Sequence, residues 1–158
     1  MKTTLIFIGP LKKIPDNGVA MKNHMFVARF REVFDKVIAI DGDKPSKRPW
    51  CIAHLVASTL LNPKATIAVS FSPATGDKVL RLLRLLRRKN VFYWAIGGTL
   101  HKRLVELGFD LETYRKLKAI YAESEQIVNG LKEIGINNGI KVNNSKRVDY
   151  FPHIHSKN

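Results

Sequence analysis

A loop with two glycines offers the first residues in this sequence whose types permit phosphate binding. It spans residues 9–18, between an apolar segment and an amphipathic one, and contains Gly9 and Gly18. Backbone N–H groups at a helix N-terminus hold anions, and a glycine lets a ligand approach the backbone closely. The glycine spacing fits neither G-x-G-x-x-G nor G-x-x-x-x-G-K-[ST]. A plain connection in which Asp16 or Asn17 caps the helix stays open as the alternative.

A second candidate site follows the apolar segment 90–96. Gly97 and Gly98 are adjacent there, and Thr99 and His101 come directly after them. Paired glycines permit close backbone approach, and the imidazole of His101 can donate or accept a proton near neutral pH. A single histidine on a helix is more often structural, so only its chemical type makes His101 a candidate catalytic residue.

Basic residues dominate the segment 77–90. Four arginines share one arc of the helical wheel: Arg81, Arg84, Arg87 and Arg88. Leucines share the opposite arc, as in a helix that packs one face on a sheet. The run from Lys78 to Lys89 contains no acid. Such a face suits anionic lipid headgroups, with about 1 kcal/mol per basic residue near the surface, or it is an ordinary solvated face.

Other signatures of catalysis or metal binding are missing from the sequence. No pair of carboxylates stands out at a strand end, and Ser124 lacks the G-x-S-x-G surround of a nucleophile elbow. The single Cys51 excludes an intrachain disulfide and a cysteine zinc cluster. His153 and His155 would need further ligands from elsewhere. We therefore predict no metal site and no bound cofactor.

The net charge narrows the choice of partners. The chain carries 27 Lys+Arg against 13 Asp+Glu, a formal charge of +14. An excess of this size attracts nucleic acid, anionic membranes or phosphorylated substrates, or simply aids solubility. The sequence has no RNP-like aromatic motif and no helix-turn-helix signature. A basic nucleic-acid-binding α/β module is the alternative interpretation.

Strands and helices alternate along the chain. Strands are predicted at residues 3–8, 35–41, 65–71, 90–96, 118–124 and 139–144. Helices are predicted at residues 19–34, 50–61, 74–89 and 125–135, with 99–117 helical in pieces. The pattern predicts a single Rossmann-like α/β domain: a doubly wound, mostly parallel sheet with helices on both faces, where ligands bind beyond the carboxyl ends of the strands. No apolar run is long enough to span a bilayer, and the first residues do not form a signal peptide, so we expect a cytoplasmic protein.

The order of these motifs resembles the N-terminal half of bacterial polysaccharide glycosyltransferases, the retaining family with two Rossmann-like domains (GT-B fold). The resemblance covers essentially the whole chain. It is carried by the loop with Asn17-Gly18, by FYWAIGGTLHKRL, and by the later segment with Glu123-Ser124-Glu125, Gly135, Asn143-Asn144 and Phe151-Pro152. The sequence departs from the family pattern at two points, since Asn17 replaces a glycine and Asn143 replaces a proline.

The resemblance implies an acceptor-binding half of an enzyme. The N-terminal domain would span residues 1–151, and residues 152–158 would begin an interdomain linker. A donor-binding domain, in cis or on a second protein, would bind the nucleotide-sugar, so the isolated chain would be inactive. Asn17 and Gly18 would face the donor phosphates.

The resemblance also assigns a cleft and a membrane face. Gly97, Gly98, Thr99 and Ser124 would line the cleft for a saccharide or lipid-linked acceptor. Members acting on lipid-linked acceptors dock on the inner face of the cytoplasmic membrane, which suggests an anionic membrane as the partner of the arginine face. A small-molecule enzyme with a complete site of its own is a third interpretation, disfavoured by the lack of paired catalytic groups.

Overall fold

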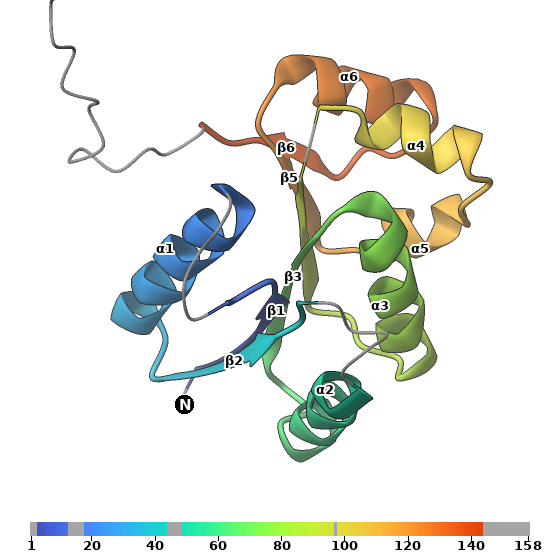
Figure 1. Cartoon of the computed structure of the whole chain (residues 1–158). Helices are drawn as coiled ribbons and strands as arrows, with labels where there is room; N and C mark the ends of the chain where they lie inside the picture. The colour runs from blue at the N-terminus through green and yellow to red at the C-terminus, as the bar shows by residue number, and fades with distance from the viewer. Residues whose placement is uncertain (1–2, 13–17, 44–48, 97, 144–158) are drawn as a thin grey trace, which may run out of the picture.

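Six parallel strands form one sheet with helices on both faces (Figure 1). The computed structural model describes residues 3–12, 18–43, 49–96 and 98–143. The strands are β1 (Thr4–Gly9), β2 (Lys36–Asp41), β3 (Thr66–Phe71), β4 (Val91–Ala95), β5 (Ala119–Ala122) and β6 (Gly139–Lys141). Their order is β2-β1-β3-β4-β5-β6, and every neighbouring pair is parallel. The predicted α/β fold class and its single domain are confirmed.

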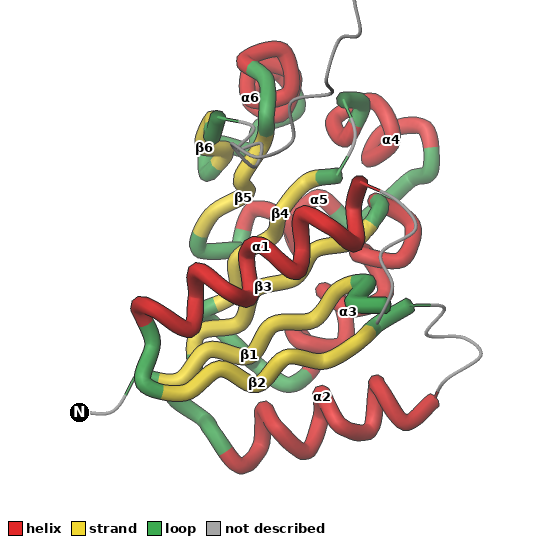
Figure 2. Tube along the Cα trace, turned by 60° about the vertical axis from the view of Figure 1, so that its left-hand side comes forward, coloured by secondary structure: helices red, strands yellow, loops and turns green. Residues whose placement is uncertain are grey.

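The helices cover the two faces of the sheet unequally. They are α1 (Gly18–Val33), α2 (Pro49–Leu61), α3 (Pro73–Leu85), α4 (Leu100–Glu106), α5 (Leu111–Arg115) and α6 (Glu125–Glu133). Figures 1 and 2 show α1 alone on one face, and α2 to α6 gathered on the other. The segment predicted to be helical in pieces is thus divided between α4 and α5.

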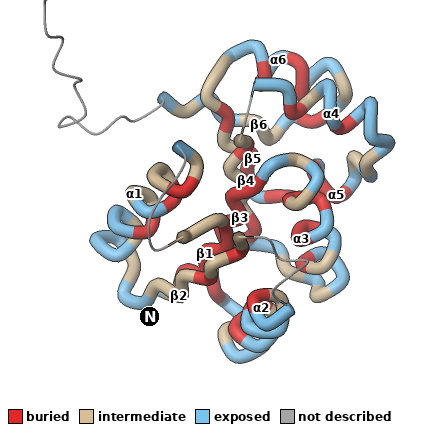
Figure 3. The backbone as a smooth tube through the Cα atoms, in the orientation of Figure 1, coloured by how far each residue is buried: buried red, intermediate tan, exposed pale blue. Residues whose placement is uncertain are grey.

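Two apolar clusters follow from this division. The larger one joins the buried side chains of α2 to α6 to the sheet, with Leu55, Leu83 and Leu131 almost fully buried. The smaller one lies under α1, where Val27 packs against Leu5 and Phe7 of β1. Figure 3 shows the buried strands between exposed outer helix surfaces, as expected for a parallel sheet covered on both faces.

An aromatic row extends the smaller cluster across the sheet. Trp94 of β4 has its ring centroid 4.2 Å from that of Phe26 on α1 and 4.6 Å from that of Tyr121 on β5. Phe92 and Tyr121 are stacked, with centroids 5.9 Å apart. These rings are half-buried and cover the part of the face beside α1.

Two helix ends carry residues that favour a terminus, and one predicted helix end is wrong. Pro73 begins α3, and Gly135, with φ of +76°, follows α6 as a C-terminal cap. The helix expected to reach Lys89 ends instead at Leu85, because Arg87 adopts a left-handed φ of +55°. The backbone N–H of Arg88 then bonds the carbonyl of Leu83 at 3.0 Å, which closes the helix end.

The remaining strand boundaries differ by a few residues from those expected. β5 and β6 are shorter than predicted, because only residues 119–122 and 139–141 pair with a neighbouring strand. The predicted domain boundary at residue 151 and the linker 152–158 lie outside the described residues.

Candidate functional site at the carboxyl edge of the sheet

The sheet changes winding direction between β1 and β3. From β1 the chain moves outward to β2, whereas from β3 it moves the other way to β4. In such sheets the crevice beyond the carboxyl ends of the two diverging strands is the usual ligand site. Gly9 ends β1 at this point. A Cβ at Gly9 would lie 2.7 Å from the carbonyl oxygen of Ser70 and 2.9 Å from Nδ2 of Asn23, so no larger residue fits.

A buried polar pair fixes α1 at this crevice. The Oγ of Ser70 donates to Oδ1 of Asn23 at 2.7 Å, and Nδ2 of Asn23 donates to the carbonyl of Pro10 at 3.1 Å. The residues are 0% (Asn23) and 1% (Ser70) exposed. The pair therefore ties α1 both to the end of β3 and to the loop after β1. The pair was not predicted from the sequence, although Asn23 shares a helical arc with the buried Ala20 and Val27.

Asp41 organises the loops that follow β1 and β2. Its Oδ1 accepts the N–H of Leu11 at 2.8 Å and the N–H of Asp43 at 3.0 Å. The side chain of Lys12 lies 3.8 Å from the carboxylate of Asp43. The described part of the first loop is thus bonded to the neighbouring loop and held near the crevice.

The N-terminus of α1 opens onto this edge. Gly18 is the first residue of the helix, and a Cβ built there meets no heavy atom within 4 Å. That space is consistent with the approach of a ligand to the first N–H groups of a long helix. The other loop residue expected to face donor phosphates, Asn17, lies outside the described residues.

An ion pair links the second turn of α1 to the end of β5. Nζ of Lys22 contacts Oε1 of Glu123, and the side chain of Lys22 is only 18% exposed. Burial lowers the pKa of Lys22. Nζ of Lys22 also lies 5.9 Å from the ring centroid of Phe26. This contact brings the start of α1 beside Ser124, which follows Glu123, and it was not expected from the sequence.

The structure gives the predicted cleft residues different surroundings. Gly98 is exposed and open, and Thr99 precedes α4 without a capping bond from its side chain. Oγ of Ser124 accepts the N–H of Ile127 at 3.3 Å and so caps α6. Gly97 lies outside the described residues. Thr99 and Ser124 each follow the carboxyl end of a strand, β4 and β5, which are neighbours in the sheet.

His101 packs against a neighbouring helix. A Cβ at Gly130 of α6 would lie 2.4 Å from its ring carbons, so the imidazole occupies the space that the glycine leaves. Its Nδ1 is buried and has no hydrogen-bond partner among the described residues. In this position the imidazole of His101 packs α4 against α6, and a catalytic role for His101 stays a prediction.

The arginines are divided between two settings. Arg81 and Arg84 are on α3, whereas Arg87 and Arg88 lie beyond its end, so the single helical arc expected from the sequence is wrong. Because the helix ends early, Arg88 turns back, and its Nη1 donates to the carbonyl of Pro63 at 3.3 Å.

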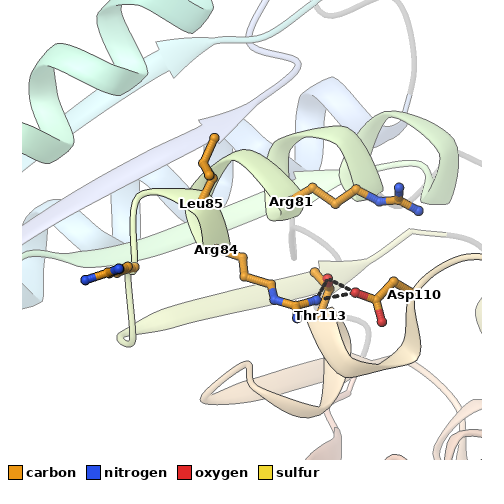
Figure 4. A pocket seen from close by; sticks show the side chains of 6 residues that line it. Arg81, Arg84, Leu85, Asp110 and Thr113 are labelled. Carbon is orange, nitrogen blue, oxygen red and sulfur yellow. Dashed lines mark hydrogen bonds and ion pairs between the residues drawn. The ribbon is translucent and has the colours of Figure 1, made fainter.

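Acids from outside the basic run pair with the arginines on α3. Nε of Arg81 lies 2.7 Å from Oδ2 of Asp77 one turn earlier. Arg84 pairs with Asp110, and its Nη1 donates to Oγ1 of Thr113 at 2.9 Å (Figure 4). An open hollow of about 440 Å³ lies here, lined by Arg81, Arg84, Leu85, Arg87, Asp110 and Thr113. It lies near the amino ends of β4 and β5, away from the crevice.

Neither a metal centre nor a membrane span emerges from the described ranges. No three His, Cys, Asp or Glu side chains are grouped there to hold a metal ion. No helix in these ranges has the length and apolar character to cross a bilayer. The chain matches no protein-family model, and no curated protein shows significant similarity to it.

Proposed function

We propose that the chain is the acceptor-binding half of a glycosyltransferase. It would bind a saccharide or lipid-linked acceptor, while a donor-binding half, in cis or on a second protein, would bind the nucleotide-sugar. The proposal rests on the composition of the carboxyl edge, where the open Gly18 and the half-buried Lys22 of α1 lie at the same edge as Thr99 and Ser124. The resemblance of the ordered motifs supplies the reaction class.

The chemistry of this edge supports binding more than bond cleavage. Helix N-termini and hydroxyl groups hold phosphates and sugar hydroxyls through hydrogen bonds. Transfer with retention also requires stabilisation of the departing diphosphate and an oriented acceptor hydroxyl. The lysines described at this edge already face acids: Lys22 contacts Glu123, Lys12 lies 3.8 Å from Asp43, and Lys141 lies 2.7 Å from Glu125. The partner half would therefore supply most of the leaving-group stabilisation.

The test is an NMR titration of the ¹⁵N-labelled chain with methyl glycosides, UDP-glucose and GDP-mannose. The glycosides should shift the amides of Gly18, Gly98, Thr99 and Ser124, and no sugar should be transferred. Gly18→Val should weaken these shifts, because it fills the open space at the start of α1. Ala28→Val, an equally β-branched change at an exposed position of the same helix, should not.

Two outcomes would contradict the proposal. Robust sugar transfer by the chain alone would remove the half-enzyme claim. Glycoside shifts confined to the opposite, amino edge of the sheet would remove the acceptor site.

We further propose that the four arginines at and beyond the end of α3 hold the chain on the inner face of the cytoplasmic membrane. Co-sedimentation with phosphatidylglycerol vesicles should fall when Arg81, Arg84, Arg87 and Arg88 become Gln. The matched control replaces four exposed basic residues elsewhere, Arg29, Arg31, Arg103 and Lys132, and so removes the same charge. An equal loss in both variants would show that net charge alone drives binding. Because Arg81 and Arg84 already have acidic partners, each should contribute less than about 1 kcal/mol.

The +14 charge also favours the second candidate, a nucleic-acid-binding module. Phosphate neutralisation would make binding fall steeply with salt concentration. A gel shift with duplex and single-stranded DNA at physiological salt separates the two proposals. Tight, length-dependent retardation would favour nucleic acid over the acceptor-binding half.

A further inference from the structure

The outer face of α2 is apolar and exposed. Trp50 is 83% exposed, Leu60 57% and Leu61 80%. Ala53, His54 and Ala57 lie between them and are also exposed. No Asp, Glu, Lys or Arg occurs in the 13 residues of the helix. We call these six exposed residues the α2 outer face.

The inner face of the same helix is also uncharged: its buried residues are Cys51, Leu55, Ser58 and Thr59. Leu55 and Cys51 pack in the larger core cluster. A helix without a charged residue on any side is ordinarily buried over most of its surface. Within the described residues, nothing covers the outer face of α2, so this face is available to another molecule.

The surroundings of α2 extend this surface to the end of the sheet. β2 is the terminal strand and pairs only with β1 in the described part of the chain. Figure 2 shows α2 running beside β2 at this end of the sheet. An open hollow of about 290 Å³ lies between them, lined by Ala39, Ile40, Asp41, Trp50, Cys51 and His54. Edge strands offer unpaired backbone groups that favour association.

The charge pattern identifies the occupant. Helices that lie in a membrane interface carry Lys and Arg along their polar side, and α2 carries neither. For a chain of charge +14, two copies repel wherever their basic surfaces meet. A contact between copies is therefore most favourable on a surface without those charges. The 13 residues of α2 provide one, although Lys47 and Arg48 precede the helix and Lys64 follows it in the sequence.

We propose that a second copy of the chain packs its own α2 against the α2 outer face across a twofold axis. In such a symmetric contact, a residue i of one copy that touches a residue j of the second copy has its mirror, because residue j of the first copy touches residue i of the second. A 13-residue helix is about 20 Å long and about 10 Å across, too small alone for the roughly 800 Å² per partner of a standard interface. The edge of β2 and the hollow must contribute, and the dimer should be weak.

The test is sedimentation velocity of the full chain from about 1 μM to 1 mM, a range that brackets a weak dimer. Leu61→Glu places a charge in the contact twice, once in each copy, and should weaken dimerisation on the order of thirtyfold or more. Leu85→Glu is the matched control, since Leu85 is 79% exposed but lies on α3. Far-UV circular dichroism checks that both variants fold.

Salt and fluorescence separate a second copy from a lipid surface. Raising NaCl should strengthen dimerisation, because it screens repulsion between two basic chains, but would weaken binding to phosphatidylglycerol vesicles. In a Trp94→Phe background, the emission of Trp50 should shift to the blue as the protein concentration rises. The proposal is overturned if the chain sediments as a monomer at all concentrations, or if Leu61→Glu and Leu85→Glu weaken dimerisation equally. A blue shift seen only with vesicles also overturns it.

Discussion

The buried pair Asn23–Ser70 allows a quantitative test of how the carboxyl edge is held. Ser70→Ala removes the hydroxyl and leaves Oδ1 of Asn23 buried without its donor. Leaving a buried acceptor unsatisfied costs about 1–3 kcal/mol. Asn23→Leu keeps the number and branching of the side-chain heavy atoms, but it is bulkier and leaves both the Ser70 hydroxyl and the carbonyl of Pro10 without a partner. It should lower the free energy of unfolding by more than Ser70→Ala does.

The double variant distinguishes a true pair from two independent sites. Combining Asn23→Leu with Ser70→Ala removes both halves of the buried bond and leaves only the Pro10 carbonyl unsatisfied. The loss should therefore be smaller than the sum of the two single losses, by about 1–2 kcal/mol. Urea unfolding followed by far-UV circular dichroism gives each free energy, with an unchanged slope as the sign of an unchanged denatured state.

A second double-mutant cycle, between residues that do not touch, gives the coupling energy expected for independent sites. Oγ1 of Thr59 bonds the carbonyl of Val56 within α2 at 2.8 Å, so Thr59→Val should add to Asn23→Leu without coupling. Independent sites add within about 0.5 kcal/mol. Coupling below that limit between Asn23 and Ser70 would refute the claim that their bond holds α1 at the crevice.

Three further changes test other features of the fold. Gly9→Ala should lower the free energy of unfolding by about 2 kcal/mol or more, since its Cβ would lie 2.7 Å from the Ser70 carbonyl; an unchanged urea midpoint would contradict this. Arg87→Gly should raise it by about 1 kcal/mol, because φ is +55° there, and a loss would show that the side chain stabilises the turn. Burial raises the pKa of the Asp77 carboxyl above its ordinary value of 3.8, so this group ionises at a lower pH in the unfolded chain than in the folded one. The free energy of unfolding should therefore fall as the pH rises from 3.8 to the folded pKa, and Asp77→Asn should remove this contribution. If urea unfolding at a series of pH values gives the same pH dependence for both proteins, the effect is excluded.

The alternation of apolar and amphipathic segments was enough to predict the sheet. Runs such as residues 3–8 and 65–71 are apolar on both faces, which is typical of strands buried in a parallel sheet. The end of α3 was not predictable in the same way. Arg87 continues the helical pattern in sequence, but its left-handed backbone ends the helix, and glycine is the residue usually found at such a position.

The candidate site was only partly predictable. Gly18, Gly98 and Thr99 were singled out because each stands next to the end of a predicted strand or the start of a predicted helix, whereas Ser124 was assigned to the cleft through the resemblance, and all four stay predictions. The ion pair of Lys22 and Glu123 joins residues far apart in sequence, on segments whose relative rotation only the packed fold determines. Periodicity gives the face of each helix but not which residue of another element it meets.

The contacts of α1 bear on how the two halves of the proposed enzyme would move. Lys22 and Asn23 are adjacent, yet they reach different strands: Lys22 contacts Glu123 beyond β5, and Asn23 bonds Ser70 on β3. Contacts in two directions fix both the position and the rotation of the first turns of α1. A partner that closes over this edge would thus meet a preformed wall, and the closing motion would belong to the partner. Hydrogen exchange at residues 22–27, whose N–H groups bond within the helix, should then be slow before a partner is added and change little afterwards.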